Sequence, residues 1–240
     1  MSVFLEWKKA KRTGFLSVFF GGGILAAAVP ALNMAFRSEM YVTQKGTPVY
    51  ILLSANWQLM AMLNVLLVVV GACLLYHTEF ADHAMQKMKS LPMRESAVFA
   101  GKAMLIFFMS IFILMMEAAA VVFCSYHWFQ IGTGDWGELW KSFGYALLLM
   151  LPCIVLSLLI AEFCRNMWVS LGIGVICVFT ATMLPANRFI FSLFPFAMPF
   201  QMFAGTDMTL IMRYICAVLA EMAVLALAEI LSIRIRREFV

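Results

Sequence analysis

Two carboxylates stand inside long apolar stretches of this sequence, where charged groups are rare. Glu117 lies in LMMEAAAVV and Glu221 in LAEMAVLA. A charged side chain at the centre of a helix in lipid costs about 2.5–3.5 kcal/mol, so each carboxylate must face protein and have a partner, or be neutral. Two interpretations stay open: the pair lines a substrate or gating path, or each is a buried polar contact that fixes helix packing.

A second group of candidate residues lies in the segment HTEFADHAMQKMKSLPMRESAVFAGK. Its apolar side chains recur at helical spacing and share one face: Ala81, Ala84, Met85, Met88 and Leu91. Glu79, Asp82 and Lys89 lie on the rest of the helix, and Pro92 ends it. The pattern predicts a short amphipathic helix over 79–91. It either docks into a groove of a partner protein through its Met-bearing face or rests on the membrane surface.

Catalytic and metal-binding chemistry is not indicated. His77 and His83 are six residues apart, so on one helix they point to different faces and do not make a metal cluster with Glu79 and Asp82. The six cysteines make no CxxC pair. The sequence contains no GxxxxGK[ST] and no GxSxG motif, so we expect no enzyme activity, metal or cofactor in this chain.

The elements that position these residues are predicted to be membrane-spanning helices. Of the 240 residues, 64% are hydrophobic and 12% are charged, half the roughly 25% of a soluble domain. A spanning helix needs roughly 20 apolar residues. Six stretches meet this requirement: Gly14–Phe36, Trp57–Tyr76, Val98–Phe123, Phe143–Glu162, Met167–Leu184 and Thr209–Ile233. The predicted fold class is therefore all-α, a polytopic membrane protein forming a single domain over 1–240.

The distribution of basic residues predicts the orientation of the chain. With the N-terminus inside, twelve of the 17 Lys and Arg residues fall in inside segments and five in outside ones. Both termini are thus predicted to be cytoplasmic, with the chain in the cytoplasmic membrane. The loops are shorter than the roughly 50 residues that a folded catalytic domain needs, and no basic tract indicates nucleic-acid binding.

Two further segments are predicted to lie at the membrane interface. Residues 1–13 combine Phe4, Leu5 and Trp7 with four basic residues, which is typical of a helix lying along anionic lipid headgroups. Residues 185–204, PANRFIFSLFPFAMPFQMFA, are aromatic but broken by three prolines. This second segment either forms half-helices that re-enter the outer leaflet under protein cover or rests as an aromatic loop on the surface.

Four short motifs follow one another in a recognisable order. The first is LEWKKAKRT at Leu5–Thr13, which is acidic and then basic, and the second is the pair Asn56 and Trp57 at the start of the second span. The third is an acidic residue after that span, then a basic helix, Leu-Pro, and a lysine in the third span: Glu79, Lys87, Lys89, Leu91, Pro92 and Lys102. The fourth is FPFAMPF at Phe194–Phe200, before the last span.

In this layout the chain resembles the membrane subunit of type-2 ABC exporters, most closely the permeases of lantibiotic-immunity and antimicrobial-peptide-resistance transporters. One departure is MRES after Pro92, where a small or β-branched residue and a Ser-Arg order are commoner. The resemblance implies that ATP is bound and hydrolysed by a separate ATPase subunit, on which the cytoplasmic helix docks. Carried over residue by residue, the ATPase-coupling positions are Glu79, Asp82, Met85, Met88, Lys89, Leu91 and Pro92.

The resemblance also implies the other partners. These are a second permease, which is a different chain or a second copy of this one, a cationic peptide substrate and membrane lipid. Two alternatives are kept beside it. One is a proton- or ion-coupled carrier that uses Glu117 and Glu221, although no inverted repeat of broken helices is visible. The other is a membrane subunit that senses or assembles without transporting.

Overall fold

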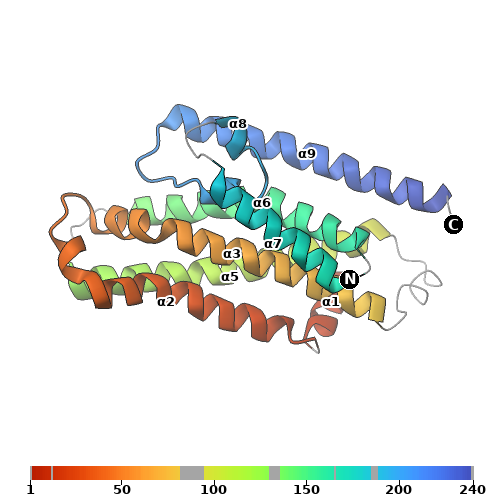
Figure 1. Cartoon of the computed structure of the whole chain (residues 1–240), viewed down its shortest axis with the longest axis horizontal. Coiled ribbons are helices and arrows are strands. Elements are labelled where there is room, and N and C mark those ends of the chain that lie inside the picture. The colour runs from red at the N-terminus through yellow and green to blue at the C-terminus, as the bar shows by residue number, and fades with distance from the viewer. Residues whose placement is uncertain are drawn as a thin grey trace.

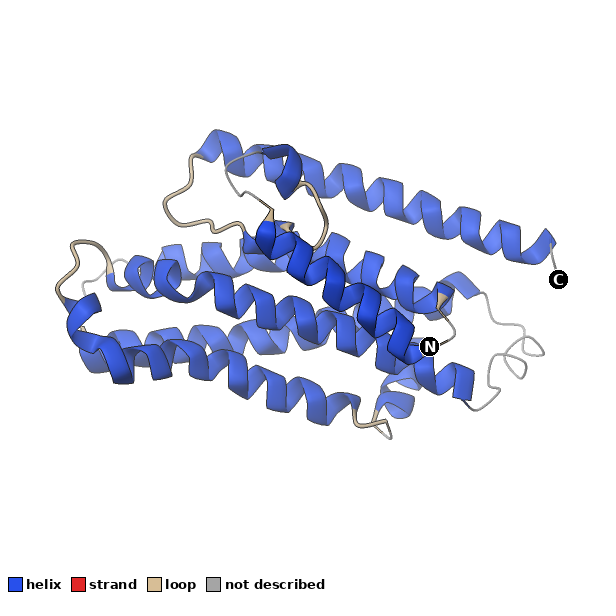
Figure 2. Ribbon diagram, in the orientation of Figure 1, coloured by secondary structure: helices blue, strands red, loops and turns tan. Residues whose placement is uncertain are grey.

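The chain folds into a bundle of long helices. The structure, a computed structural model, describes residues 2–11, 13–81, 95–129, 136–164, 166–184 and 189–238. Within these ranges all regular elements are helical, which confirms the predicted all-α class (Figure 2). They are α1 Ser2–Ala10, α2 Phe15–Val42, α3 Pro48–Ala81, α5 Glu95–Trp128, α6 Trp136–Phe163, α7 Met167–Met183, α8 Phe189–Ser192, the 3-10 turn η1 Met198–Phe200, and α9 Met208–Glu238.

Five of the described helices are long and apolar enough to cross a membrane: α2, α3, α5, α6 and α9. The sixth predicted span corresponds to α7, which has 17 residues. At 1.5 Å per residue it is about 25 Å long, somewhat short of a hydrocarbon core of about 30 Å. The chain is therefore a multi-pass membrane protein, and the spanning role of α7 stays a prediction.

Several helices extend beyond the apolar stretches that predicted them. Helix α3 begins at Pro48, nine residues before the predicted start at Trp57. Proline suits the first turn of a helix because its missing N–H would have no partner there and its φ is already helical. Apolar patterning marks the part of a helix in hydrocarbon, whereas backbone hydrogen bonding continues into the polar interface.

Successive long helices run in opposite directions, and α3 lies at the centre of the bundle (Figure 1). Helix α3 packs against α2, α5, α6 and α7, whereas α9 lies at the edge and packs mainly on α6. The segments that contain the two termini, together with the ends of α3 and α5 that flank residues 82–94, lie at one end of the bundle (Figure 1). The turn between α2 and α3 lies at the other end. This arrangement fits an even number of passes, while the side that faces the cytoplasm stays a prediction.

Close helix contacts in the core depend on glycine. A Cβ built on Gly71 of α3 would lie 2.6 Å from the ring of Phe19 in α2. A Cβ on Gly174 of α7 would overlap the side chain of Val69 in α3. Small residues let helices approach closely in membranes, where van der Waals packing rather than the hydrophobic effect drives their association.

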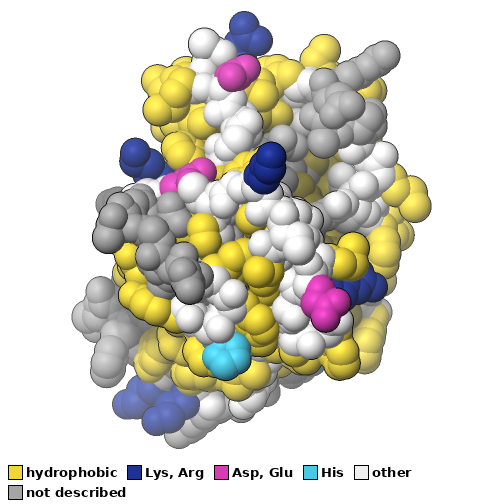
Figure 3. Space-filling view, turned by 90° about the vertical axis from the view of Figure 1, so that its left-hand side faces the viewer, with side chains coloured by type: hydrophobic (Ala, Val, Ile, Leu, Met, Phe, Trp, Pro, Cys, Tyr) yellow, Lys and Arg dark blue, Asp and Glu magenta, His cyan; other side chains and the backbone are white. Residues whose placement is uncertain are grey.

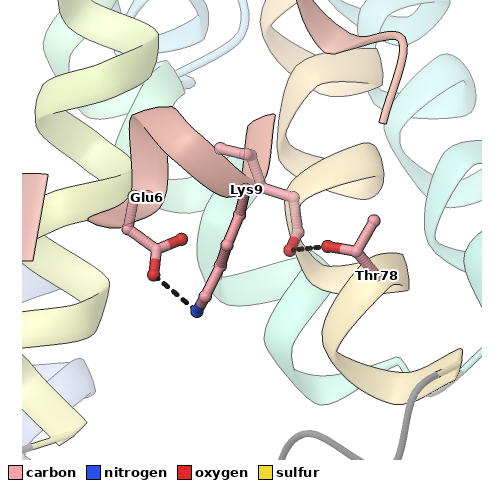
Figure 4. A network of polar contacts seen from close by, with 4 residues as sticks. Glu6, Lys9 and Thr78 are labelled. Atoms are coloured by element: carbon pink, nitrogen blue, oxygen red, sulfur yellow. Dashed lines mark hydrogen bonds and ion pairs between the residues drawn. The ribbon is translucent and has the colours of Figure 1, made fainter. Parts of the chain in front are cut away.

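The two predicted interfacial segments contain helical structure. Helix α1 packs against α5, and its buried Glu6 accepts a hydrogen bond of 2.8 Å from Lys9. Figure 4 shows this ion pair in one view with Thr78 of α3, whose hydroxyl donates to the Leu75 carbonyl. Trp7 and Lys8 are exposed on the other side of α1. The interfacial role of residues 1–13 stays a prediction.

Within 185–204, residues 185–188 lie outside the described part of the chain. The remainder forms α8 and η1, and η1 packs against both α3 and α6. Phe196, Ala197, Met198 and Pro199 are buried there, so protein covers this broken backbone. Protein cover is the condition under which irregular backbone is tolerated at membrane depth. Re-entry of this segment into the outer leaflet, one of its two predicted arrangements, stays a prediction.

Candidate functional site

Helix α3 presents one continuous face to the centre of the bundle. Trp57, Ala61 and Asn64 recur at spacings of four and three residues, so they lie one above another on a helix. On α5, Leu114 and Glu117 share a face in the same way. Because α3 and α5 pack directly on one another, these two faces bring Asn64 and Glu117 into contact.

The contact is a hydrogen bond between the two helices. The Nδ2 of Asn64 donates to Oε2 of Glu117 over 3.1 Å. Both side chains are buried, with exposures of 4% for Asn64 and 1% for Glu117. Hydrogen bonds between helices in a membrane satisfy polar groups that would otherwise meet hydrocarbon. The carboxyl of Glu117 therefore has the partner that its position in the sequence required.

A small cavity lies beside this hydrogen bond. Its volume is about 10 Å³, close to the minimum of roughly 10–15 Å³ that one water molecule needs. Side chains of α3, α5, α6 and η1 line it: Trp57, Met60, Ala61, Asn64, Leu114, Glu117, Ala146, Met150 and Pro199. The residues that the structure describes contain no cluster of His, Cys, Asp or Glu able to hold a metal ion. With a volume of about 10 Å³, the cavity is too small for a substrate in this packing of the helices.

A second polar link joins α2 to α3 near the turn between them. Asn33 Nδ2 donates to Oδ1 of Asn56 over 2.8 Å and to the hydroxyl of Tyr41 over 3.1 Å. Asn56 in turn donates to the Leu52 carbonyl over 2.8 Å. The adjacent residues Asn56 and Trp57 therefore have separate roles, because Asn56 contacts α2 while Trp57 lines the central cavity.

Lys102 of the third motif is buried near the opposite end of α3 and α5. Only 1% of the residue is exposed, and its Nζ lies 3.6 Å from the ring centroid of Tyr76 in α3. A cation over an aromatic face is attracted by the negative π surface, most strongly where water is excluded. This contact ties α3 to α5 close to the predicted cytoplasmic helix.

Most of the predicted ATPase-coupling residues lie outside the described part of the chain. Glu79 falls in the last turn of α3, and nothing is described of its side chain. The others lie within the undescribed residues 82–94: Asp82, Met85, Met88, Lys89, Leu91 and Pro92. Their role stays a prediction. Helix α3 precedes this segment and helix α5 follows it. The same two helices carry the Asn64–Glu117 hydrogen bond.

The structure does not bring the two predicted intramembrane carboxylates into one cluster. Glu221 is half-buried on α9, where its Oε2 is buried and has no hydrogen-bonding partner among the described residues. It does not line the Glu117 cavity. Helix α9 packs mainly on α6 and only slightly on α5.

A wider groove lies toward the end of the bundle that carries η1. Its volume is about 160 Å³, and it runs between α3, α7 and residues 189–201. Its walls mix amides, hydroxyls and aromatic rings: Gln58, Ala181, Thr182, Leu184, Phe191, Ser192, Ala197, Phe200 and Gln201. Gln201 donates to Ser192 over 3.2 Å. Because Pro199 lines the cavity while Ala197 and Phe200 line the groove, η1 forms a wall of both spaces.

Sequence reasoning missed Asn64, the partner of Glu117. An asparagine in an apolar stretch carries no charge, so it gave a weaker signal than the carboxylates. Its spacing of seven residues from Trp57, which places both on one face of α3, was the available indication.

Residues 2–181 match the sequence model of a family described as "ABC-2 family transporter protein". No curated protein and no solved structure matches the chain significantly. The match covers α1 to α6 and most of α7, and thus both residues of the Asn64–Glu117 contact. The chain belongs to the ABC-2 transporter family, and it is a multi-pass membrane permease subunit of an ABC transporter.

Proposed function

We propose that this permease exports lantibiotic-type or other cationic antimicrobial peptides from a bacterial cytoplasmic membrane and so confers immunity or resistance. The observation that carries the transport assignment is the family match over residues 2–181. The peptide class is supported by the four motifs, from LEWKKAKRT near the N-terminus to FPFAMPF before α9.

Coupling to ATP hydrolysis is proposed to run through residues 79–91. The sequence pattern predicts a helix there, and that helix would dock its face bearing Met85 and Met88 on a separate ATPase subunit. Since α3 and α5 flank the segment, a displacement of the docked helix would act directly on both. A rigid-body shift of α3 against α5 is the kind of change that opens and closes a path between packed helices.

The opposite end of the bundle would be the side of release. Glu138 at the start of α6 and Asp207 before α9 lie there, in the described part of the chain. Figure 3 looks onto this end and shows charges of both signs scattered over a largely apolar and uncharged surface. Scattered exposed charges are screened within about 10 Å by salt, so their attraction for a cationic peptide is weak. The groove beside η1, which is lined by both polar and aromatic side chains, suits an amphipathic peptide better than these scattered charges do.

Co-purification from a native-like complex tests the proposal. The chain would be expressed with the genes adjacent to its own, purified in detergent, and assayed for a co-eluting ATPase. Replacing Met85 and Met88 with Glu is expected to reduce the amount of ATPase recovered at least tenfold. The matched control is Gln86→Glu, which adds a charge to the other face of the same predicted helix and is expected to retain the partner.

The substrate is tested on cells that carry the intact operon. When the variant with Met85 and Met88 replaced is expressed, survival in the presence of a cationic lantibiotic should fall. It should equal the survival of cells that lack the permease. Peptide export that persists after ATP depletion with the proton gradient intact would contradict ATP-driven export and favour the carrier. If cells that lack the permease survive the lantibiotic as well as cells that carry it, the peptide substrate is contradicted, whereas the assignment as a permease subunit is not.

A further inference from the structure

Three residues around the central cavity each carry a buried polar atom that has no hydrogen-bonding partner in the described part of the protein. The atoms are Trp57 Nε1, Asn64 Oδ1 and Glu117 Oε1. Trp57 is 6% exposed, Asn64 4% and Glu117 1%, and all three line the same cavity of about 10 Å³. Leaving a buried polar group unsatisfied is costly, and groups of this kind commonly bind an ordered water.

The three atoms have the hydrogen-bonding character that one water molecule complements. Trp57 Nε1 is a donor, whereas the oxygens of Asn64 and of an ionised Glu117 are acceptors. A water molecule can accept from the indole and donate to the two oxygens, which uses both of its hydrogens. We propose that this cavity binds a single water molecule that joins Trp57, Asn64 and Glu117.

The same water also suits the neutral carboxyl. If Glu117 carries a proton on Oε1, that atom becomes a donor. The water then accepts from Glu117 and Trp57 and donates to Asn64, so no atom loses its partner. The site thus takes a small molecule that both donates and accepts, and it holds this molecule in either protonation state of Glu117.

Cations fit the cavity less well than water does. An ammonium group has donors only, so it would leave the Trp57 N–H without a partner. Ca²⁺, a typical hard metal ion, takes six to eight oxygen ligands. Here the lining residues offer two oxygens and one N–H without a partner among the described residues, and most of the other lining side chains are apolar. The proposal concerns the link between α3 and α5 and holds whatever substrate the permease carries.

Direct observation of the site is the first test. The full-length chain, in lipid nanodiscs and together with the ATPase that co-purifies with it, would be imaged at a resolution that shows ordered water. We expect a density peak about 2.7–3.2 Å from Trp57 Nε1 and about 2.5–3.0 Å from Asn64 Oδ1 and Glu117 Oε1. Absence of that peak overturns the proposal. So does a peak closer than about 2.4 Å to the two oxygens, since that is a metal–ligand distance and too short for a hydrogen bond.

A mutational cycle supplies a second, independent test. Trp57→Phe removes the N–H but keeps a ring, and its effect on the unfolding temperature would be measured in three backgrounds. In the unaltered chain and in Glu117→Gln, which resembles the neutral carboxyl, the shift is expected to be about 2–4 °C downward. In the Glu117→Leu background the water is expected to be displaced, so the Trp57 N–H has already lost its partner. The shift caused by Trp57→Phe should there be less than about half of the shift in the unaltered chain.

Ser110→Ala is the matched control background for this cycle. Ser110 is buried on α5 like Glu117, but its hydroxyl donates to the Ile106 carbonyl of its own helix and it does not line the cavity. The Trp57→Phe shift should be unchanged there. Equal shifts in the Glu117→Leu and Ser110→Ala backgrounds would overturn the water site.

Discussion

Glu117 and Glu221 have similar sequence surroundings and different structural ones. Each interrupts an apolar stretch that is long enough to span a membrane. Glu117 lies on α5 among side chains from α3, α6 and η1, and Asn64 donates to it. Glu221 is half-buried on α9, a helix at the edge of the bundle. The difference shows that the surroundings of a carboxylate in an apolar helix are set by the neighbouring helices rather than by the sequence of its own helix.

The packing of the two regions differs in the same sense. In the most apolar part of α3, 67% of residues are buried within the chain, whereas in that of α9 only 11% are. Large side chains such as Leu219, Leu227 and Leu231 are exposed on α9. Helix α3 is therefore specified by contacts within this chain, while α9 meets lipid or another subunit.

The largest effect is expected from Glu117→Leu. The substitution leaves the Asn64 amide buried without its acceptor, which should lower the free energy of unfolding by about 2–3 kcal/mol. Glu117→Gln keeps an acceptor for Asn64 and should lose less than about 1 kcal/mol. Thermal unfolding of the purified chain in detergent measures both. Equal stability of the Leu and Gln variants would show that the Asn64 hydrogen bond does not stabilise the bundle.

The outcome at Glu117 also defines what sequence reasoning can achieve here. The carboxylate was identified because its charge is rare in an apolar helix. Asn64 was not, because the pairing depends on how α3 and α5 are rotated about their axes, and single-helix periodicity does not fix that rotation between neighbours. Likewise, hydropathy predicted six stretches but not that α3 would be central and α9 peripheral.

Gly71→Ala tests the tight packing of the central region. The added methyl would meet the ring of Phe19, which is fully buried and has little room to move. Overpacking of this kind costs about 1–3 kcal/mol. Gly144→Ala on α6 is the matched control, since nothing lies within 4 Å of its added Cβ. The comparison would fail if both variants unfolded at the same temperature.

A smaller effect is expected from removing equal volumes from the two regions. Val65 of α3 is 0% exposed, whereas Val224 of α9 is 64% exposed. Val65→Ala should cost about 1–2 kcal/mol because the surrounding helices close only partly around the lost methyl groups. Val224→Ala should cost little, since lipid fills the space. Denaturation of both variants in the same detergent gives the difference directly.

The smallest effect is expected from Glu221→Leu, a change of the same chemical kind as Glu117→Leu. No described residue of the chain hydrogen-bonds to the buried Oε2 of Glu221, so the substitution removes an unsatisfied polar atom and leaves none behind. Stability should change by less than about 0.5 kcal/mol, or rise, because replacing an unpaired polar group with an apolar one is close to neutral. Thermal unfolding of the isolated chain and peptide resistance in cells would be measured side by side. If stability is unchanged but resistance is lost, Glu221 acts on a group outside this chain, and the exposed face of α9 becomes the surface on which to seek the second permease.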